Sequence, residues 1–370
     1  MRAFLVLLGF SLLACTGTST DEPQDTAACD GALHTDTMSL TSDADGQVTI
    51  PITLSDLDDA FMVLTEKASG TASTDGVVDP DGNTVLDWED WASSRTSLTN
   101  AFYASPDVTV LNWPVRAEDG PLSPGDWTVY ASTLDADGYP KAKQAVDVTV
   151  LRRQCVAGRP RVKVTIVYTN RLEKDAEVTS AVEQAADRWA EIYGAAGVDI
   201  DVDYASADAD GSLPEPLPGD DEYTSFYSDV GEGVMVVIGD DVGGMDDLFG
   251  EAGGIPGPQI ATPHSVVAVG WLIHAGADAS FSKDEIELLA ETMAHESGHF
   301  LGLYHPVESS FDMWDALGDT DKCTRSGDCD DALGTNMMYP YPICSGAKCT
   351  DQVDISGDQA GVLLNNVGVR

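Results

Sequence analysis

The chain has 370 residues, enough for two domains of ordinary size, and its hydrophobic content of 43% allows a packed core in each. Its 19 Lys and Arg against 63 Asp and Glu give a net charge of −44. This charge argues against nucleic-acid binding and against electrostatic docking on anionic lipid, because phosphate groups would be repelled along most of the surface. The acidic residues predict a strongly solvated surface, and some of them could bind calcium, which prefers carboxylate oxygens.

Residues 1–14 have the pattern of an export signal. A positive start at Arg2 precedes an apolar run over residues 4–13, which is too short to span a bilayer. The run ends in Leu-Leu-Ala, directly before Cys15, and so resembles the lipobox of bacterial lipoproteins. That resemblance implies cleavage before Cys15, lipidation of this residue, and a protein anchored by lipid at the outer membrane or cell surface, outside the cytoplasm. An ordinary secretory signal cleaved near Ala14 is the alternative.

The residues after the signal predict a flexible tether and three disulfides. Residues 15–28 lack large apolar side chains and predict a flexible tether. Beyond Cys15, six cysteines remain, and an even number in an exported chain indicates three disulfides. Cys29 and Cys155 bracket a stretch of domain length, and we favour a disulfide between them. The other four cluster toward the C-terminus with their pairing left open: Cys323, Cys329, Cys344 and Cys349.

Residues 29–155 predict a small β-sandwich domain. Short runs of alternating apolar and polar residues are separated by Asp-Gly and Pro-Gly pairs, with no convincing amphipathic helix. Residues 122–129 resemble the late strand of immunoglobulin-like and bacterial pre-peptidase domains. Two Asp-x-Asp-Gly stretches, at 43–46 and 135–138, are expected to form turns rather than calcium loops. The alternating runs are residues 47–54, 108–111, 127–131 and 146–150.

Residues 156–370 predict an α/β domain with helices packed on a twisted sheet. A helix over 175–193 carries one apolar stripe. A second helix starts at the capping box of Ser282 and Glu285 and continues into a cluster of histidines. The expected strands cover residues 161–168, 198–202, 233–238 and 265–273.

The histidine cluster predicts a metal site. His295 and His299 are four residues apart on a helix, so both project from one face. Gly302 tolerates the left-handed conformation that ends a helix, and the turn there would bring His305 back as a third ligand. Three nitrogen ligands leave a fourth position for water, as in catalytic zinc sites. Glu296 would then act as general base on the zinc-bound water, and peptide-bond hydrolysis follows.

The extended motif at 295–305, His-Glu-x-x-His-x-x-Gly-x-x-His, resembles the metzincin metallopeptidases. Metzincins have a turn with a methionine beneath the metal. The candidate here is Met338, because the sequence Met338-Tyr339-Pro340 resembles matrixins and Asn336-x-Met338 resembles pappalysins. Met337 is the alternative, which would place Tyr339 where astacin-like enzymes have a metal-binding tyrosine. The resemblance implies a zinc endopeptidase acting on proteins or peptides, with a pocket for the residue after the scissile bond walled by Tyr339, Pro340 and Tyr341.

The same resemblance carries three further expectations. An edge strand near residues 266–272 would pair with an extended substrate by β-augmentation. Cys155 could be a latency cysteine of the matrixin kind instead of a disulfide partner. An acidic segment after the third histidine could hold calcium beside the site, or form only a disulfide-stapled loop, through Asp319, Asp321, Asp328 and Asp330.

The sequence is also compatible with a second class of function. The chain could be a surface adhesion or carbohydrate-binding lipoprotein in which the sandwich is the functional domain and the peptidase fold is inactive or accessory. The candidates for a sugar platform are Trp88, Trp91 and Trp113. In either case we expect a monomer whose only membrane contact is the N-terminal lipid.

Overall fold

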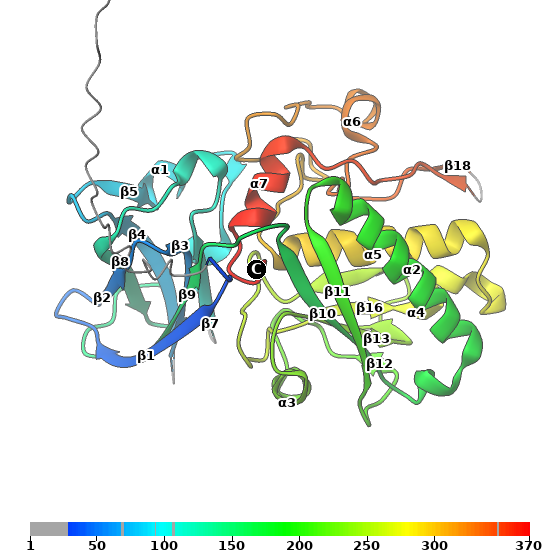
Figure 1. Ribbon diagram of the computed structural model, residues 1–370, viewed down its shortest axis with the longest axis horizontal. Coiled ribbons are helices and arrows are strands. Elements are labelled where there is room, and N and C mark those ends of the chain that lie inside the picture. Colours follow the sequence, from blue (N-terminus) through cyan, green and yellow to red (C-terminus); the bar gives the residue numbers. More distant parts are fainter. Residues whose placement is uncertain (1–28, 68–69, 93, 106–107, 346–347) are drawn as a thin grey trace, which may run out of the picture.

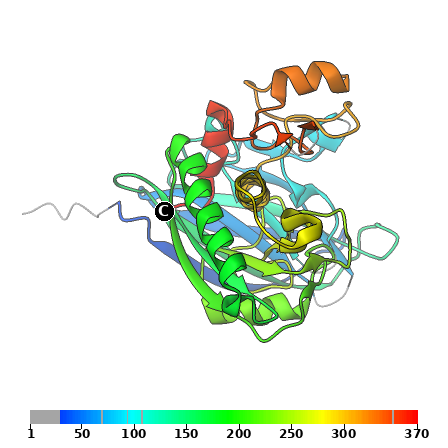
Figure 2. The same ribbon diagram turned by 90° about the vertical axis from the view of Figure 1, so that its right-hand side faces the viewer.

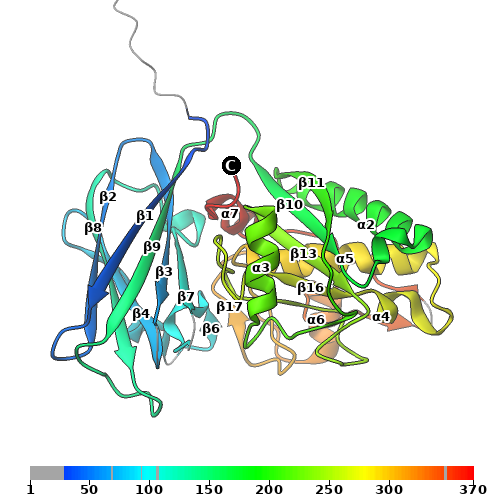
Figure 3. The same ribbon diagram turned by 90° about the horizontal axis from the view of Figure 1, so that it is seen from below.

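The computed structural model describes residues 29–370, except 68–69, 93, 106–107 and 346–347. The predicted signal peptide, the lipidation site Cys15 and the tether lie outside the described residues. Within the described part of the chain, no helix has the length and hydropathy needed to cross a membrane. An antiparallel β-sandwich lies beside a mixed α/β unit, with helix α7 (Gly357–Asn365) close to their junction (Figures 1 and 3). The predicted fold class, a β-sandwich followed by an α/β unit, is confirmed.

The sandwich consists of two four-stranded antiparallel sheets, ordered β1-β9-β3-β7 and β2-β8-β4-β5. Strand β2 has the predicted bounds and buries every second residue, as its alternating sequence requires. The inward side chains form one core that contains Phe61, Trp113 and Trp127. The strands are β1 (Leu33–Thr41), β2 (Gln47–Leu54), β3 (Asp58–Glu66), β4 (Thr71–Val78), β5 (Thr84–Asp87), β7 (Val108–Trp113), β8 (Gly125–Leu134) and β9 (Ala145–Gln154).

The α/β unit is built on a five-stranded sheet ordered β11-β10-β13-β16-β15, in which only the edge strand β15 is antiparallel. Helices α2 and α5 pack together on one face, as Figure 2 shows in green and yellow, and helix α3 packs on the other. The sheet contains β10 (Arg161–Tyr168), β11 (Asp199–Ser206), β13 (Val234–Gly239), β15 (Gly250–Ala252) and β16 (Val267–Gly270). The helices are α2 (Ala176–Ala195), α3 (Asp221–Val230) and α5 (Lys283–Phe300).

One predicted strand is corrected by the structure. The strand expected over 265–273 is only β16, and helix α4 (Trp271–Ala275) begins directly after it. Strand β16 lies inside the sheet, hydrogen-bonded to β13 on one side and β15 on the other. All its residues are buried, as is typical of a central strand covered on both faces. The expectation of a substrate-binding edge at 266–272 is therefore wrong, because β15 forms that edge.

Short elements complete the chain. They are α1 (Glu89–Ala92), β6 (Thr96–Ser97), η1 (Asn100–Phe102), η2 (Ala117–Asp119), η3 (Leu172–Lys174), β12 (Ser212–Leu213), β14 (Asp241–Val242), η4 (Gly276–Asp278), β17 (Trp314–Asp315), α6 (Ser326–Leu333), β18 (Cys344–Ser345) and β19 (Lys348–Cys349). Both Asp-x-Asp-Gly stretches form turns: Asp43 Oδ1 accepts from the backbone of Asp45 and Gln47, and Asp135 Oδ1 does the same for residues 137 and 139.

Three disulfides join the six cysteines of the described chain. They are Cys29–Cys155, Cys323–Cys329 and Cys344–Cys349. The predicted bond between Cys29 and Cys155 is confirmed, so the sulfur of Cys155 is not available as a latency ligand for a metal. The two C-terminal disulfides each close a short loop, one between helix α6 and the segment before it and one across the β18–β19 hairpin.

The sandwich and the α/β unit are joined by buried polar contacts. Arg153 of β9 is 4% exposed, and its Nη1 donates to the backbone oxygens of Leu364, Asn366 and Val369 at 2.6–2.8 Å. Strand β6 of the sandwich segment pairs in parallel with β17, which follows the third histidine. The hydroxyl of Tyr304 also donates to Asn100 Oδ1. The chain around His305 is therefore supported by residues 95–100 of the other domain.

His274 of α4 makes folding stability depend on pH. The side chain is 1% exposed, with Nδ1 2.6 Å from Gly270 O and Nε2 3.0 Å from Thr292 Oγ1. Burial lowers the pKa of His274 to about 4, well below the value near 6.5 of an unfolded chain. The contribution of the buried, neutral His274 to the free energy of unfolding is therefore complete above about pH 6.5. It is lost as the pH falls toward 4, and the total loss is roughly 3 kcal/mol.

We expect the free energy of unfolding of the wild type, minus that of His274→Gln, to decrease by roughly 2 kcal/mol between pH 7 and pH 5. Urea titrations of both proteins at the two pH values measure it. Buried carboxylates with raised pKa values, such as Glu291 and Glu251, titrate in the opposite sense, but they are present in both proteins and cancel. A difference that stays constant with pH would contradict the prediction.

Candidate metal centre

Helix α5 and the turn after it position the three histidines. The helix begins at the predicted capping box: Ser282 Oγ accepts from the backbone N–H of Glu285, and the Glu285 carboxylate accepts from that of Ser282. The helix ends at Phe300, and Gly302 follows with φ +111°, a conformation that favours glycine. The backbone N–H of Leu303 then donates to Gly298 O at 2.9 Å. The chain thus reverses and returns His305 over the helix.

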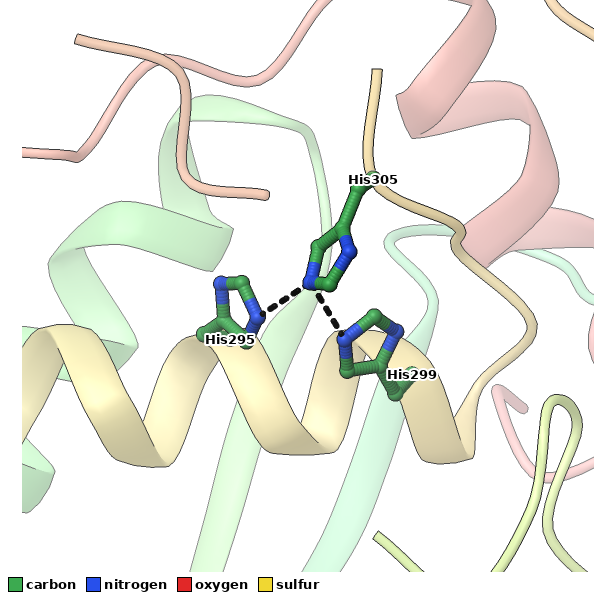
Figure 4. Close-up of side chains that lie close together, drawn as sticks. All are labelled: His295, His299 and His305. Carbon is green, nitrogen blue, oxygen red and sulfur yellow. Dashed lines mark hydrogen bonds between the residues drawn. The ribbon is translucent and has the colours of Figure 1, made fainter. Parts of the chain in front are cut away.

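The three imidazoles converge on one point (Figure 4). His305 Nε2 lies 3.2 Å from His295 Nε2 and 3.1 Å from His299 Nε2. In the part of the chain that the structure describes, these residues form the one group of three or more His, Cys, Asp or Glu side chains that could hold a metal ion. The histidines proposed as ligands from the sequence are therefore brought together.

Each histidine is oriented by an acceptor on its other nitrogen. His295 Nδ1 lies 2.8 Å from Met337 O, His299 Nδ1 lies 2.7 Å from Leu303 O, and His305 Nδ1 lies 2.9 Å from Glu308 Oε2. A carbonyl or carboxylate oxygen can only accept, so each Nδ1 must carry the proton. This leaves each Nε2 directed at the shared point, which is the arrangement in which neutral imidazoles bind a metal ion.

This geometry fits a tetrahedral metal. Bonds of about 2.0–2.1 Å to zinc place two nitrogen ligands about 3.3 Å apart. The observed separations of 3.1 and 3.2 Å are close to that value. Burial, followed by the neighbouring histidines, lowers the pKa of His295 to about 3 and the pKa of His299 well below its usual value. Both imidazoles are therefore neutral at physiological pH, the state that binds a metal.

Glu296 lies beside the histidines and against the edge strand β15. Burial, together with the nearby charge of Glu251, raises the pKa of Glu296 to about 8, and a hydrogen bond with the Ala252 backbone opposes the shift. A cation among the histidines would favour the ionised carboxylate. Strand β15 approaches closely because Gly250 has no side chain, since a Cβ there would lie 2.9 Å from Glu296 Cγ.

The two methionines of the predicted turn have different contacts. Met338 is buried, and its sulfur would lie 2.7 Å from a Cβ added at Gly298, so it packs beneath the helix between the two histidines. Its backbone N–H donates to Asn336 Oδ1 at 2.9 Å. Met337 supplies the carbonyl that orients His295. The hydroxyl of Tyr339 donates to Asp330 Oδ1 at 2.7 Å, and this contact directs it toward the acidic loop.

A pocket of about 340 Å³ opens beside His295 and Glu296. Residues 247–250, which lead into β15, form one side of it. The predicted pocket residues Tyr339, Pro340 and Tyr341 all line it, and so do Glu291 and Gln352. This arrangement places a mostly apolar pocket next to the histidines and next to an edge strand.

The four aspartates considered for calcium are not brought together. Asp319 accepts from Ser356 Oγ at 2.8 Å and from the Asp358 backbone N–H at 2.9 Å, so it holds the start of α7. Asp330 accepts from the hydroxyls of Tyr339 and Tyr341. Asp321 and Asp328 are exposed. These contacts make the segment a disulfide-stapled acidic loop.

The chain matches no family model and no curated protein. Among solved structures, it is similar to archaemetzincin from Methanopyrus kandleri, with 18% identity and a TM-score of 0.27 over 39% of this chain and 76% of that one. It is also similar to metalloproteinase-II from Bacteroides fragilis, with 15% identity and a TM-score of 0.28 over 49% of this chain and 52% of that one. At these TM-scores neither likeness identifies a family, and the function proposed below rests on the geometry of the site.

Several residues of the site were not predicted from the sequence. Glu308 follows His305 by three residues, and a carboxylate so close to a candidate ligand is a usable signal for an orienting partner. Glu291 precedes His295 by four residues and therefore shares its helix face. Gly250 and the carbonyls of Leu303 and Met337 have no signal in the sequence, because the chain reversal and the sheet alone place them.

Proposed function

We propose that the protein is a zinc-dependent endopeptidase that hydrolyses proteins or peptides outside the cytoplasm. The observation that carries the proposal is the convergence of three Nε2 atoms, 3.1 and 3.2 Å apart, with Glu296 beside them at an open pocket. The choice of zinc follows from three imidazole ligands in a geometry that suits a tetrahedral ion with one open position. The likeness of the motif to metzincins supports the same conclusion.

The residues of the site account for the reaction as follows. Zinc, when bound to the three histidines, would polarise a carbonyl and acidify water. The Glu296 carboxylate would accept a proton from the attacking water and pass it to the leaving amine. The outer edge of β15 is not paired with another strand among the described residues, so its backbone can bind an extended substrate. Met338 keeps the histidine-bearing helix in place from below.

The experiment that tests the proposal combines metal content with cleavage. Purified protein should contain about one zinc per chain and should cleave casein. A chelator should abolish cleavage, and one equivalent of zinc should restore it. Protein that binds no zinc, or that cleaves equally well after chelation, would refute the proposal.

We further propose that the protein acts as a lipid-anchored monomer at the outer membrane or cell surface. The signal-like sequence before Cys15 and the three disulfides support export, since disulfides persist in oxidising compartments. The lipid is its proposed membrane contact, and the charge of −44 opposes nucleic-acid partners.

The alternative of a carbohydrate-binding sandwich gains no support from its tryptophans. Trp113 is 1% exposed and belongs to the sandwich core. Trp91 packs partly against the same core and lies under the guanidinium of Arg116, so Trp88 is the exposed member of the three.

Substitution of Glu308 tests the metal site without changing any of its three histidine ligands. Its carboxylate orients His305, so Glu308→Ala is expected to weaken zinc binding by about 10- to 100-fold. Competition with a zinc-binding dye measures the affinity. The matched control is Asp312→Ala, an exposed carboxylate in the same loop, which should bind zinc as the wild type does. Equal affinities for the Glu308 variant and the wild type would contradict the orienting role.

A further inference from the structure

Glu291 is a carboxylate inside the pocket that the proposed reaction does not use. It lies four residues before His295 on α5, so both side chains share one helix face, about 6 Å apart along the axis. The residue is 6% exposed and is one of the residues that line the pocket. The pocket therefore runs along the helix from the metal-binding histidines toward a buried acid.

The surroundings of Glu291 contain more negative than positive charge. Its Oε1 accepts from the Gln352 backbone N–H at 2.8 Å, and no described residue donates to Oε2. Burial raises the pKa of Glu291 to about 7, and the charges of Glu287 and Asp351 raise it while Arg188 opposes them. Arg188 is itself bonded to Glu287 at 2.6 Å. No lysine or arginine lines the pocket within the described chain.

The walls of the pocket suit a long aliphatic stem. Leu248, Phe249, Leu288 and Tyr341 line the pocket together with His295 and Glu291. Lysine and arginine bury such a stem while their charged head seeks a polar partner. A leucine in the same place would leave Glu291 without a partner, and an acidic side chain would be repelled.

We propose that this pocket selects a lysine or arginine side chain of the substrate, which Glu291 binds at the inner end of the pocket. The inference rests on the proposed peptidase function and names its substrate class. The resemblance to metzincins places the selected residue directly after the scissile bond. Glu291 is thus a specificity residue, and it takes no part in the proton transfer by Glu296.

Binding of two probes tests the proposal without requiring turnover. Both are peptide hydroxamates that chelate zinc, identical except that one carries lysine and the other norleucine in the pocket position. Calorimetry on the zinc-loaded protein should show the lysine probe binding about 10- to 100-fold more tightly, as expected for a charge-assisted hydrogen bond in a partly buried site. Glu291→Gln keeps an oxygen for the Gln352 N–H and should reduce the ratio to within about threefold.

Asp284→Asn is the matched control, because Asp284 is exposed on the same helix and lines only the neighbouring acidic hollow. It should keep the wild-type ratio. Equal binding of both probes to the wild type, or a ratio that survives Glu291→Gln, would overturn the inference. A glutamate probe adds a test on the wild type alone and should bind most weakly of the three; stronger binding than norleucine would also overturn it.

The same experiment separates this inference from the peptidase proposal. A protein that distinguishes the probes but cleaves no protein substrate would refute the peptidase function and support the pocket that binds a cationic side chain. A protein that cleaves casein with zinc but prefers norleucine would keep the peptidase function and refute the pocket.

Discussion

Glu296→Gln is expected to lower kcat/KM at least 100-fold, within the range of about 10²–10⁴ that general acid–base groups contribute. The amide retains the size of the side chain but cannot accept the proton of the attacking water. Zinc content should not change, because the three Nε2 ligands and their acceptors do not include this residue. Steady-state cleavage of a quenched peptide, together with metal analysis of the same sample, measures both effects.

Glu287→Gln is the matched control for this experiment. It changes a carboxylate on the same helix that bonds to Arg188, away from the histidines. Its activity should stay within about threefold of the wild type. Wild-type activity in the Glu296 variant would show that another group activates the water, and the mechanism would have to be abandoned.

Arg153→Met should lower the free energy of unfolding by about 3–5 kcal/mol, because it removes the donor to the backbone oxygens of Leu364 and Val369 and leaves Asp59 without its ion-pair partner. The guanidinium donates to three backbone oxygens of the C-terminal segment through Nη1 and pairs with Asp59 through Nε at 2.8 Å. Methionine fills a similar volume but donates no hydrogen bond. Urea-induced unfolding followed by tryptophan fluorescence measures the loss.

Arg159→Met provides the comparison. Its side chain is 51% exposed and pairs with Asp199, which is 44% exposed, so its loss should cost at most about 1 kcal/mol. If the two arginine variants unfold at the same urea concentration, the contacts of Arg153 do not stabilise the junction between the domains.

Local patterns accounted for the parts of the structure that could be predicted. The bounds of β10 match the sequence prediction because its alternation is regular, and α5 begins where the capping box predicts. The histidines could be placed together because helix geometry and a glycine turn are both short-range. The pairing of Cys29 with Cys155 could be predicted from the even number of cysteines and from their positions on either side of a stretch of domain length.

Long-range contacts account for what could not be predicted. Strand β15 has three residues and no alternation, and its position at the sheet edge depends on pairing with β16. We expected residues 266–272 to form the edge of the sheet, a position that β15 occupies. A buried apolar run does not indicate which strands lie on either side of it. The bonds of Arg153 join residues more than two hundred positions apart, which no local pattern reveals.

The contacts of Arg153 also determine when the protein can reach its final state. Its three acceptors lie in residues 364–369, which come after all the strands of the sandwich and of the α/β unit in chain order. During synthesis and export, the sandwich and the sheet can therefore form while this guanidinium still lacks its partners. The loop that carries His305 rests on the sandwich through the pairing of β17 with β6, which precedes these acceptors in the chain. The contacts that join the two domains through Arg153 can therefore form only after residues 364–369 have been translated.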